Sequence, residues 1–176
     1  PYTILCGIAF ILVFLYHGAL YTCIKTVGAI SERARATALV EGVVTAVGAL
    51  VLVGATYVYT DLFKSTLAAV AFAAAIICFL ISWGVTRVRR PGLGFVFSCL
   101  TVIFVTVAYF AGLLPRIMVS SLDPAWSLTV SNASSSTYTL TLMTVVALVF
   151  VPIILIYQAW TYWTFRHRVS EEDLHY

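Results

Sequence analysis

The chain has 176 residues, of which 62% are hydrophobic and 10% are charged, and its formal net charge is +3. A soluble domain of this length cannot bury so much apolar surface, and long apolar runs are typical of membrane spans. The composition therefore excludes an ordinary soluble domain, and we expect membrane lipids rather than nucleic acid around the chain.

The first apolar run begins almost at Pro1, without the basic region and small-residue cleavage site of a signal peptide. We therefore expect the chain to be part of a longer polypeptide. About 20 apolar residues cross a bilayer, and five segments reach that length. They predict an all-α polytopic transmembrane bundle in one domain (residues 1–176), built as a four-helix bundle plus one peripheral helix. The predicted spans are residues 3–24, 36–60, 66–86, 93–114 and 139–164.

Basic residues lie mostly on one side of the predicted membrane. Eight of the ten Lys and Arg residues follow the first, third or fifth span, whereas Lys64 and Arg116 lie on the other side. Because loops rich in Lys and Arg stay in the cytoplasm, the chain should start outside the cell and end inside it. Residues 120–138 are then extracytoplasmic, and residues 166–176 form a cytoplasmic tail. The eight residues are Lys25, Arg33, Arg35, Arg87, Arg89, Arg90, Arg166 and Arg168.

The segment before the last span is polar yet nearly uncharged. DPAWSLTVSNASSSTYTL (123–140) contains eight Ser or Thr hydroxyls and one charge. Residues 134–137 are suitable N-caps for the fifth span, since their side-chain oxygens can accept from free helical N–H groups. The low charge suits close contact with a partner on the outer surface. Trp126, Asn132 and Tyr138 are the candidates for that contact; the alternative is a loop that only caps its own bundle.

Two ionisable side chains, His17 and Glu41, lie within the apolar spans. His17 precedes Lys25 by eight residues and Glu41 follows Arg33 by eight, so both should lie roughly 12 Å in from the basic loop. One interpretation is a proton-coupled site of a transporter or channel. Another is a His–Glu hydrogen bond that locks two helices, or a Glu41 that extends toward Arg33 and Arg35. We predict that His17 and Glu41 lie within hydrogen-bonding reach, directly or through one water.

Residues that would ligate a cofactor are sparse. A bis-histidine haem needs two intramembrane imidazoles, but His167 and His175 follow the last span, so we expect no haem or metal ligand and no catalytic residue in this chain. A haem b membrane anchor remains an alternative. Tyr157, Gln158 and Trp160, near the cytoplasmic end of the last span, are candidates for contact with lipid or a quinone.

A resemblance to a known family lies mainly in residues 119–174. The ordered elements D-P-x-W-S-L-T, N-A-S-S-S-x-Y-T-L, T-x-V-A-L-x-F-x-P-I and Y-Q-x-W-x-Y-W-x-F-R resemble the C-terminal end of subunit II of the cytochrome bd-type quinol oxidases. Upstream, PYTILCGIAFILVFLYHGALYTCIKTVG and ERARATALV resemble the start of that subunit's second half, and GFVFSCLTV resembles its next-to-last helix. The resemblance covers essentially all of the chain.

The resemblance implies a complex in the bacterial plasma membrane that oxidises quinol and reduces O₂ to water in the aerobic respiratory chain. In this family subunit I carries the b- and d-type haems and the quinol-oxidising loop, and a small accessory subunit is a further partner. The chain would be the C-terminal half of subunit II, a non-catalytic part that stabilises subunit I. The sequence lacks the family's first half, so none of the family's proton-path carboxylates carries over to a residue here.

Overall fold

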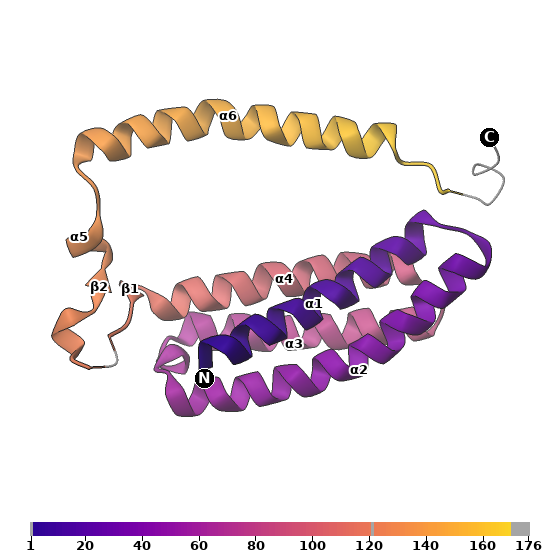
Figure 1. Cartoon of the computed structure of the whole chain (residues 1–176), viewed down its shortest axis with the longest axis horizontal. Helices are drawn as coiled ribbons and strands as arrows, with labels where there is room; N and C mark the ends of the chain where they lie inside the picture. The colour runs from indigo at the N-terminus through magenta and orange to yellow at the C-terminus, as the bar shows by residue number, and fades with distance from the viewer. Residues whose placement is uncertain (1, 121, 170–176) are drawn as a thin grey trace. The chain divides into compact units, whose positions relative to one another are not determined.

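The computed structural model describes residues 2–120 and 122–169 (Figure 1). These residues form two compact units. Unit 1 contains the described residues up to Leu113 together with Arg168 and Val169, and unit 2 runs from Leu114 to His167. The sequence predicted one domain. The division arises because the helices of unit 1 bury side chains against one another, whereas the long helix of unit 2 has no buried residue.

Five described helices are long and apolar enough to cross a membrane, which confirms the predicted all-α, five-span class. Four belong to unit 1 and one to unit 2, in agreement with a four-helix bundle plus a separate helix. The connections within unit 1 are short, and the link between its second and third helices includes the 3₁₀ turn η1 (Leu62–Lys64). The helices are α1 (Tyr2–Lys25), α2 (Gly28–Tyr59), α3 (Thr66–Arg87), α4 (Pro91–Leu113) and α6 (Thr137–Thr164).

Helix α2 begins eight residues before the predicted span. Hydropathy identifies only the apolar part of a helix. The polar residues before position 36 form the N-terminal turns of the same helix. The Arg35 Nη2–Glu32 Oε2 ion pair of 2.9 Å spans one turn there. At 1.5 Å per residue, α2 is about 48 Å long, which exceeds a hydrocarbon core of about 30 Å. The first turns of α2 therefore extend beyond the apolar part of the helix.

Small residues allow the helices of unit 1 to approach closely. Helix α1 packs along α2, α3 packs along α4, and α1 also contacts α4, whereas α2 and α3 touch little. Ala68 of α3 and Ala108 of α4 are fully buried in one cluster with Phe72. The close approach of α3 and α4 also requires a glycine at position 94, because a Cβ there would overlap the hydroxyl of Thr86.

Buried hydroxyl groups tie the helices to one another. Ser82 Oγ donates to the Gly94 carbonyl at 2.6 Å, so the Tyr16 hydroxyl, 2.8 Å away, must donate to Ser82. This chain of hydrogen bonds links α1, α3 and α4. The Trp83 Nε1–H of α3 donates to the Leu39 carbonyl of α2 at 3.1 Å. Among the described residues, each buried polar side-chain atom has a hydrogen-bond partner.

Unit 2 begins with short elements that the sequence did not predict. Strand β1 (Arg116–Met118) pairs antiparallel with β2 (Leu128–Thr129), and between them lies the 3₁₀ turn η2 (Pro124–Trp126). The short helix α5 (Val130–Ala133) follows. Ser136 then caps α6 by accepting from the Thr139 N–H, as the cluster of hydroxyls at 134–137 predicted.

Candidate functional site

His17 of α1 is hydrogen bonded to α4. Its Nδ1 lies 2.8 Å from Ser98 Oγ, and Ser98 Oγ donates its own hydrogen to the Phe95 carbonyl at 2.7 Å. A hydroxyl has one hydrogen to give, so Nδ1 must carry the proton and donate to Ser98. The imidazole also stacks on the Phe95 ring, with centroids 4.6 Å apart. These contacts fix the ring orientation and leave Nε2 as an acceptor in the neutral imidazole.

The Nε2 atom of His17 reaches the surface of unit 1. No described residue hydrogen bonds to it, yet every buried polar side-chain atom in the described part of the chain has a partner. Since Nε2 has none, it cannot be fully buried. An acceptor nitrogen that is not fully buried, and that has no partner among the described residues, therefore lies in a helix long enough to span a membrane.

Glu41 of α2 is half-buried, and no hydrogen bond or ion pair joins it to another described residue. The predicted direct His17–Glu41 contact is not among the contacts of the described residues, because His17 bonds Ser98 instead. Two residues at the same depth on neighbouring helices need not face each other, because each step along a helix rotates the side-chain direction by about 100°. Gly42, the neighbour of Glu41, faces Trp83 and Tyr16, whereas His17 turns toward α4.

The candidate contact residues of unit 2 are exposed within that unit. Trp126 is 67% exposed and Tyr138 is 79% exposed. Asn132 has a local role, since its Oδ1 accepts from the Thr129 N–H at 2.7 Å and completes the capping box of α5. On α6, Tyr157 and Trp160 are exposed and their rings are 6.3 Å apart. Gln158, between them, is exposed too, and contact of these three with lipid or a quinone stays a prediction.

Sequence analysis did not find an apolar cavity of about 240 Å³ between the four helices of unit 1. Its two lining hydroxyls are already satisfied, since Thr45 donates to the Leu12 carbonyl and Thr101 to the Phe97 carbonyl. The cavity thus offers apolar surface without a free hydrogen-bonding group, and it suits only apolar occupants. Residues of all four helices line the cavity, so no local sequence pattern encodes it.

Comparison with known proteins assigns the chain to a family. The sequence model described as cytochrome bd terminal oxidase subunit II matches residues 1–165. The chain belongs to this family. Such membership does not favour the transporter or channel interpretation of His17 and Glu41, and the structure does not join the two residues.

Similar proteins carry related names. Cytochrome bd ubiquinol oxidase subunit 2 of Bacillus subtilis is 32% identical over 174 residues, covering 98% of this chain and 52% of the relative. Cytochrome bd-I ubiquinol oxidase subunit 2 of Escherichia coli K12 is 31% identical over 206 residues, with 99% and 54% covered. A probable cytochrome oxidase subunit 2 of Haemophilus influenzae is 29% identical over 193 residues, with 92% and 51% covered. The chain spans about half the length of these curated relatives.

The donor set of this chain does not fit a haem on its own. Within the described helices long enough to span a membrane, His17 is the single imidazole, and its Nδ1 already donates to Ser98. His167 follows α6, and Met143 lies in the other unit from His17. The described residues of unit 1 therefore supply no second imidazole and no methionine that could pair with His17 on a haem. We derive no catalytic step through haem for this chain.

Proposed function

We propose that this chain is part of the second subunit of a cytochrome bd-type quinol:O₂ oxidoreductase, and that it supports a haem-bearing partner subunit. The observation that carries the proposal is the family match over residues 1–165. The Bacillus and Escherichia relatives are both named as subunits of ubiquinol oxidases. Five apolar helices suit a component of a respiratory complex in the membrane.

A supporting, non-catalytic role is favoured by the way polar groups are used inside the spans. The hydroxyls of Tyr16 and Ser82 hold helices together. Among the described residues, no direct hydrogen bond or ion pair joins His17 to Glu41, which supports a structural use of these polar groups. The b- and d-type haems would then belong to subunit I, with quinol as a substrate of the whole complex.

Contacts with subunit I would use polar atoms and aromatic rings that have no partner, or are exposed, within their own unit. An acceptor nitrogen facing hydrocarbon is costly unless a donor meets it. We place a hydroxyl or indole N–H donor of the partner subunit against His17 Nε2. The exposed rings of Trp126 and Tyr138 suit a second contact at the outer surface. A small accessory subunit and lipids would cover further parts of α6.

The orientation that we propose follows the distribution of basic residues. The chain would start outside the cell and end in the cytoplasm of a bacterium, with residues 120–138 outside. Most of the cations lie in or next to the α1–α2 and α3–α4 connections, and Glu32, in the first turns of α2, forms an ion pair with Arg89 of the α3–α4 turn at one end of unit 1. Both connections therefore lie on the same side of the membrane.

Removal of this segment tests the proposal. Deleting the codons for residues 1–176 from the native gene should abolish the b- and d-type bands in reduced-minus-oxidised spectra of the membranes, together with quinol-dependent O₂ uptake. A plasmid copy of the complete gene should restore both. Membranes that keep the bands and the uptake without the segment would contradict the proposed function.

A variant of His17 tests the absence of haem ligation. In the assembled complex, His17→Leu should leave every haem band in place, because His17 is not expected to ligate haem, while the yield of complex falls as the contact with the partner weakens. Full assembly with the loss of one b-type band would show that His17 is a haem ligand.

A further inference from the structure

One end of unit 1 concentrates positive charge. It consists of the last residue of α1, the α1–α2 connection, the first two turns of α2, the last residue of α3 and the α3–α4 turn. We call this region the basic end. Its described residues include one carboxylate, that of Glu32, and six cationic side chains. The six are Lys25, Arg33, Arg35, Arg87, Arg89 and Arg90.

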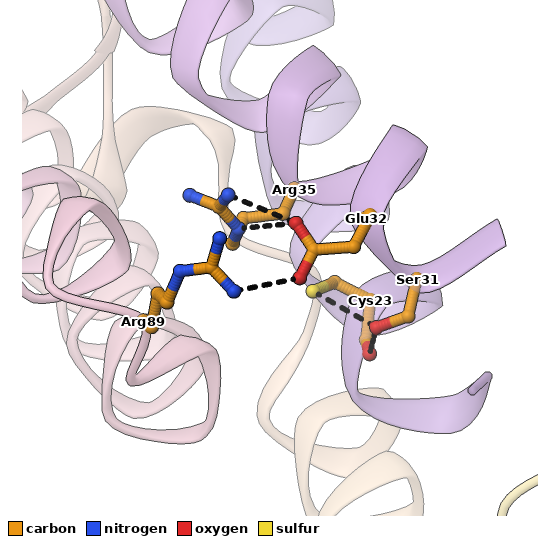
Figure 2. A network of polar contacts seen from close by, with 5 residues as sticks. All are labelled: Cys23, Ser31, Glu32, Arg35 and Arg89. Atoms are coloured by element: carbon orange, nitrogen blue, oxygen red, sulfur yellow. Dashed lines mark hydrogen bonds and ion pairs between the residues drawn. The ribbon is translucent and has the colours of Figure 1, made fainter. Parts of the chain in front are cut away.

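Glu32 holds two arginines from different parts of the chain. Figure 2 shows the guanidinium groups of Arg35, from α2, and Arg89, from the α3–α4 turn, converging on the Glu32 carboxylate. Arg35 Nη2 lies 2.9 Å and Nε 3.2 Å from Oε2, and Arg89 Nη1 lies 3.2 Å from Oε1. One carboxylate cannot neutralise two guanidiniums, so this triad keeps a positive charge.

The backbone at Arg89 adopts a conformation that normally belongs to glycine. Helix α3 ends in a Schellman motif: the Arg90 N–H bonds the Val85 carbonyl and the Arg89 N–H bonds the Thr86 carbonyl. Arg89 has φ 60°, in the left-handed region, at the position where Gly is usual. An arginine there costs conformational energy that a glycine would avoid.

The basic end keeps unused donors after its internal contacts are made. Glu32 occupies two N–H donors of Arg35 and one of Arg89, so most donors of both groups are left. Arg33 and Arg90 are exposed and have no acidic partner among the described residues. Arg87 lies over the Trp83 ring, 4.6 Å from its centroid, which leaves its charge uncompensated.

We propose that the basic end binds the phosphate of an anionic phospholipid headgroup, with Arg89 and Arg35 as its principal donors. Phosphate accepts paired N–H donors from guanidinium groups, and Glu32 already holds two such groups side by side. We assign the phosphate to a lipid because the cationic residues lie at the ends of apolar helices that are long enough to cross the bilayer. Basic pockets between helices at the cytoplasmic surface are suited to such headgroups.

Lipid binding to the purified complex tests this site. The complex is placed in nanodiscs of phosphatidylcholine with increasing phosphatidylglycerol, and native mass spectrometry counts retained phosphatidylglycerol. Each cation beside an anionic surface contributes a factor of about five, so the double variant Arg35→Gln with Arg89→Gln should bind phosphatidylglycerol about 25-fold more weakly. The double variant with Lys at both positions keeps the charges but loses the paired N–H donors, so it should bind phosphatidylglycerol more weakly than the wild type and more tightly than the Gln double variant.

The matched control lies at the other end of the helices. Lys64 also pairs with an exposed carboxylate, Asp61, at 2.8 Å and i,i+3 spacing. Lys64→Gln should leave phosphatidylglycerol binding unchanged. Equal binding by the wild type and the Gln double variant would overturn the proposal, and so would an equal loss in Lys64→Gln.

Two further experiments distinguish a lipid headgroup from other anions that the basic end could bind. Inorganic phosphate alone should not raise the melting temperature of the complex; stabilisation by phosphate equal to that by the lipid would overturn the assignment to a headgroup. The backbone N–H of Val169 bonds the Lys25 carbonyl at 2.8 Å, and the next residues along the sequence include three carboxylates at 171–173. A variant with Glu171→Gln, Glu172→Gln and Asp173→Asn removes these carboxylates. If phosphatidylglycerol bound only to this variant, the chain's own carboxylates would be the anions that the basic end binds, and the lipid proposal would fail.

Discussion

Replacement of Gly42 by alanine should destabilise the bundle. A Cβ at this position of α2 would overlap Trp83 Cδ1, and it would lie 2.8 Å from Trp83 Nε1 and 3.3 Å from Tyr16 Cε2. Overpacking of this kind costs about 1–3 kcal/mol. Moving the indole would also weaken the Trp83–Leu39 hydrogen bond, worth about 1 kcal/mol. Alanine returns up to about 1 kcal/mol of helix propensity, so we expect a net loss of about 1–3 kcal/mol.

Gly54 provides a matched control on the same helix. A Cβ there would meet nothing within 4 Å, so Gly54→Ala should be neutral or stabilising by up to about 1 kcal/mol. Thermal unfolding of the purified complex in mild detergent, followed by circular dichroism, compares the two variants. The Gly42 variant should melt several degrees lower than the Gly54 variant. Equal melting temperatures would refute the close α2–α3 approach at Trp83.

Three other substitutions test local features. Ser82→Ala should cost about 1–3 kcal/mol in the same melting assay, since it leaves the Tyr16 hydroxyl without its acceptor; no change would contradict that bond. Arg89→Gly should be more stable than Arg89→Ala by about 1 kcal/mol, because only glycine relieves the left-handed backbone; the reverse order would contradict the Schellman motif. Ser136→Ala should speed hydrogen exchange at the Thr139 amide, since it removes the α6 cap; unchanged exchange would show that Ser136 does not cap the helix.

Hydropathy predicted the helical spans because each apolar run is long and uninterrupted. The true start of α2 was missed since its first turns are polar yet helical, held by the Glu32–Arg35 pair. Strands β1 and β2, with three and two residues, are too short for an alternating pattern to appear in the sequence.

The surroundings of His17 were harder to predict than its depth. Its partner Ser98 lies 81 positions away on α4, and only the packing of α1 against α4 brings them together. His17 lies in α1 and Glu41 in α2, but their equal spacing from the basic residues carried no information about helical phase. The Glu32–Arg89 pair, 57 positions apart, was missed for the same reason.

The measurement that tests the central claim most directly is purification of the complete subunit through an affinity tag, in mild detergent, from its native membrane. We predict that a haem-bearing partner copurifies, that the reduced-minus-oxidised spectrum of the eluate shows b- and d-type bands, and that the eluate consumes O₂ when quinol is added. A subunit that purifies intact and folded, without haem bands and without quinol-dependent O₂ uptake, would contradict its assignment as part of a quinol oxidase.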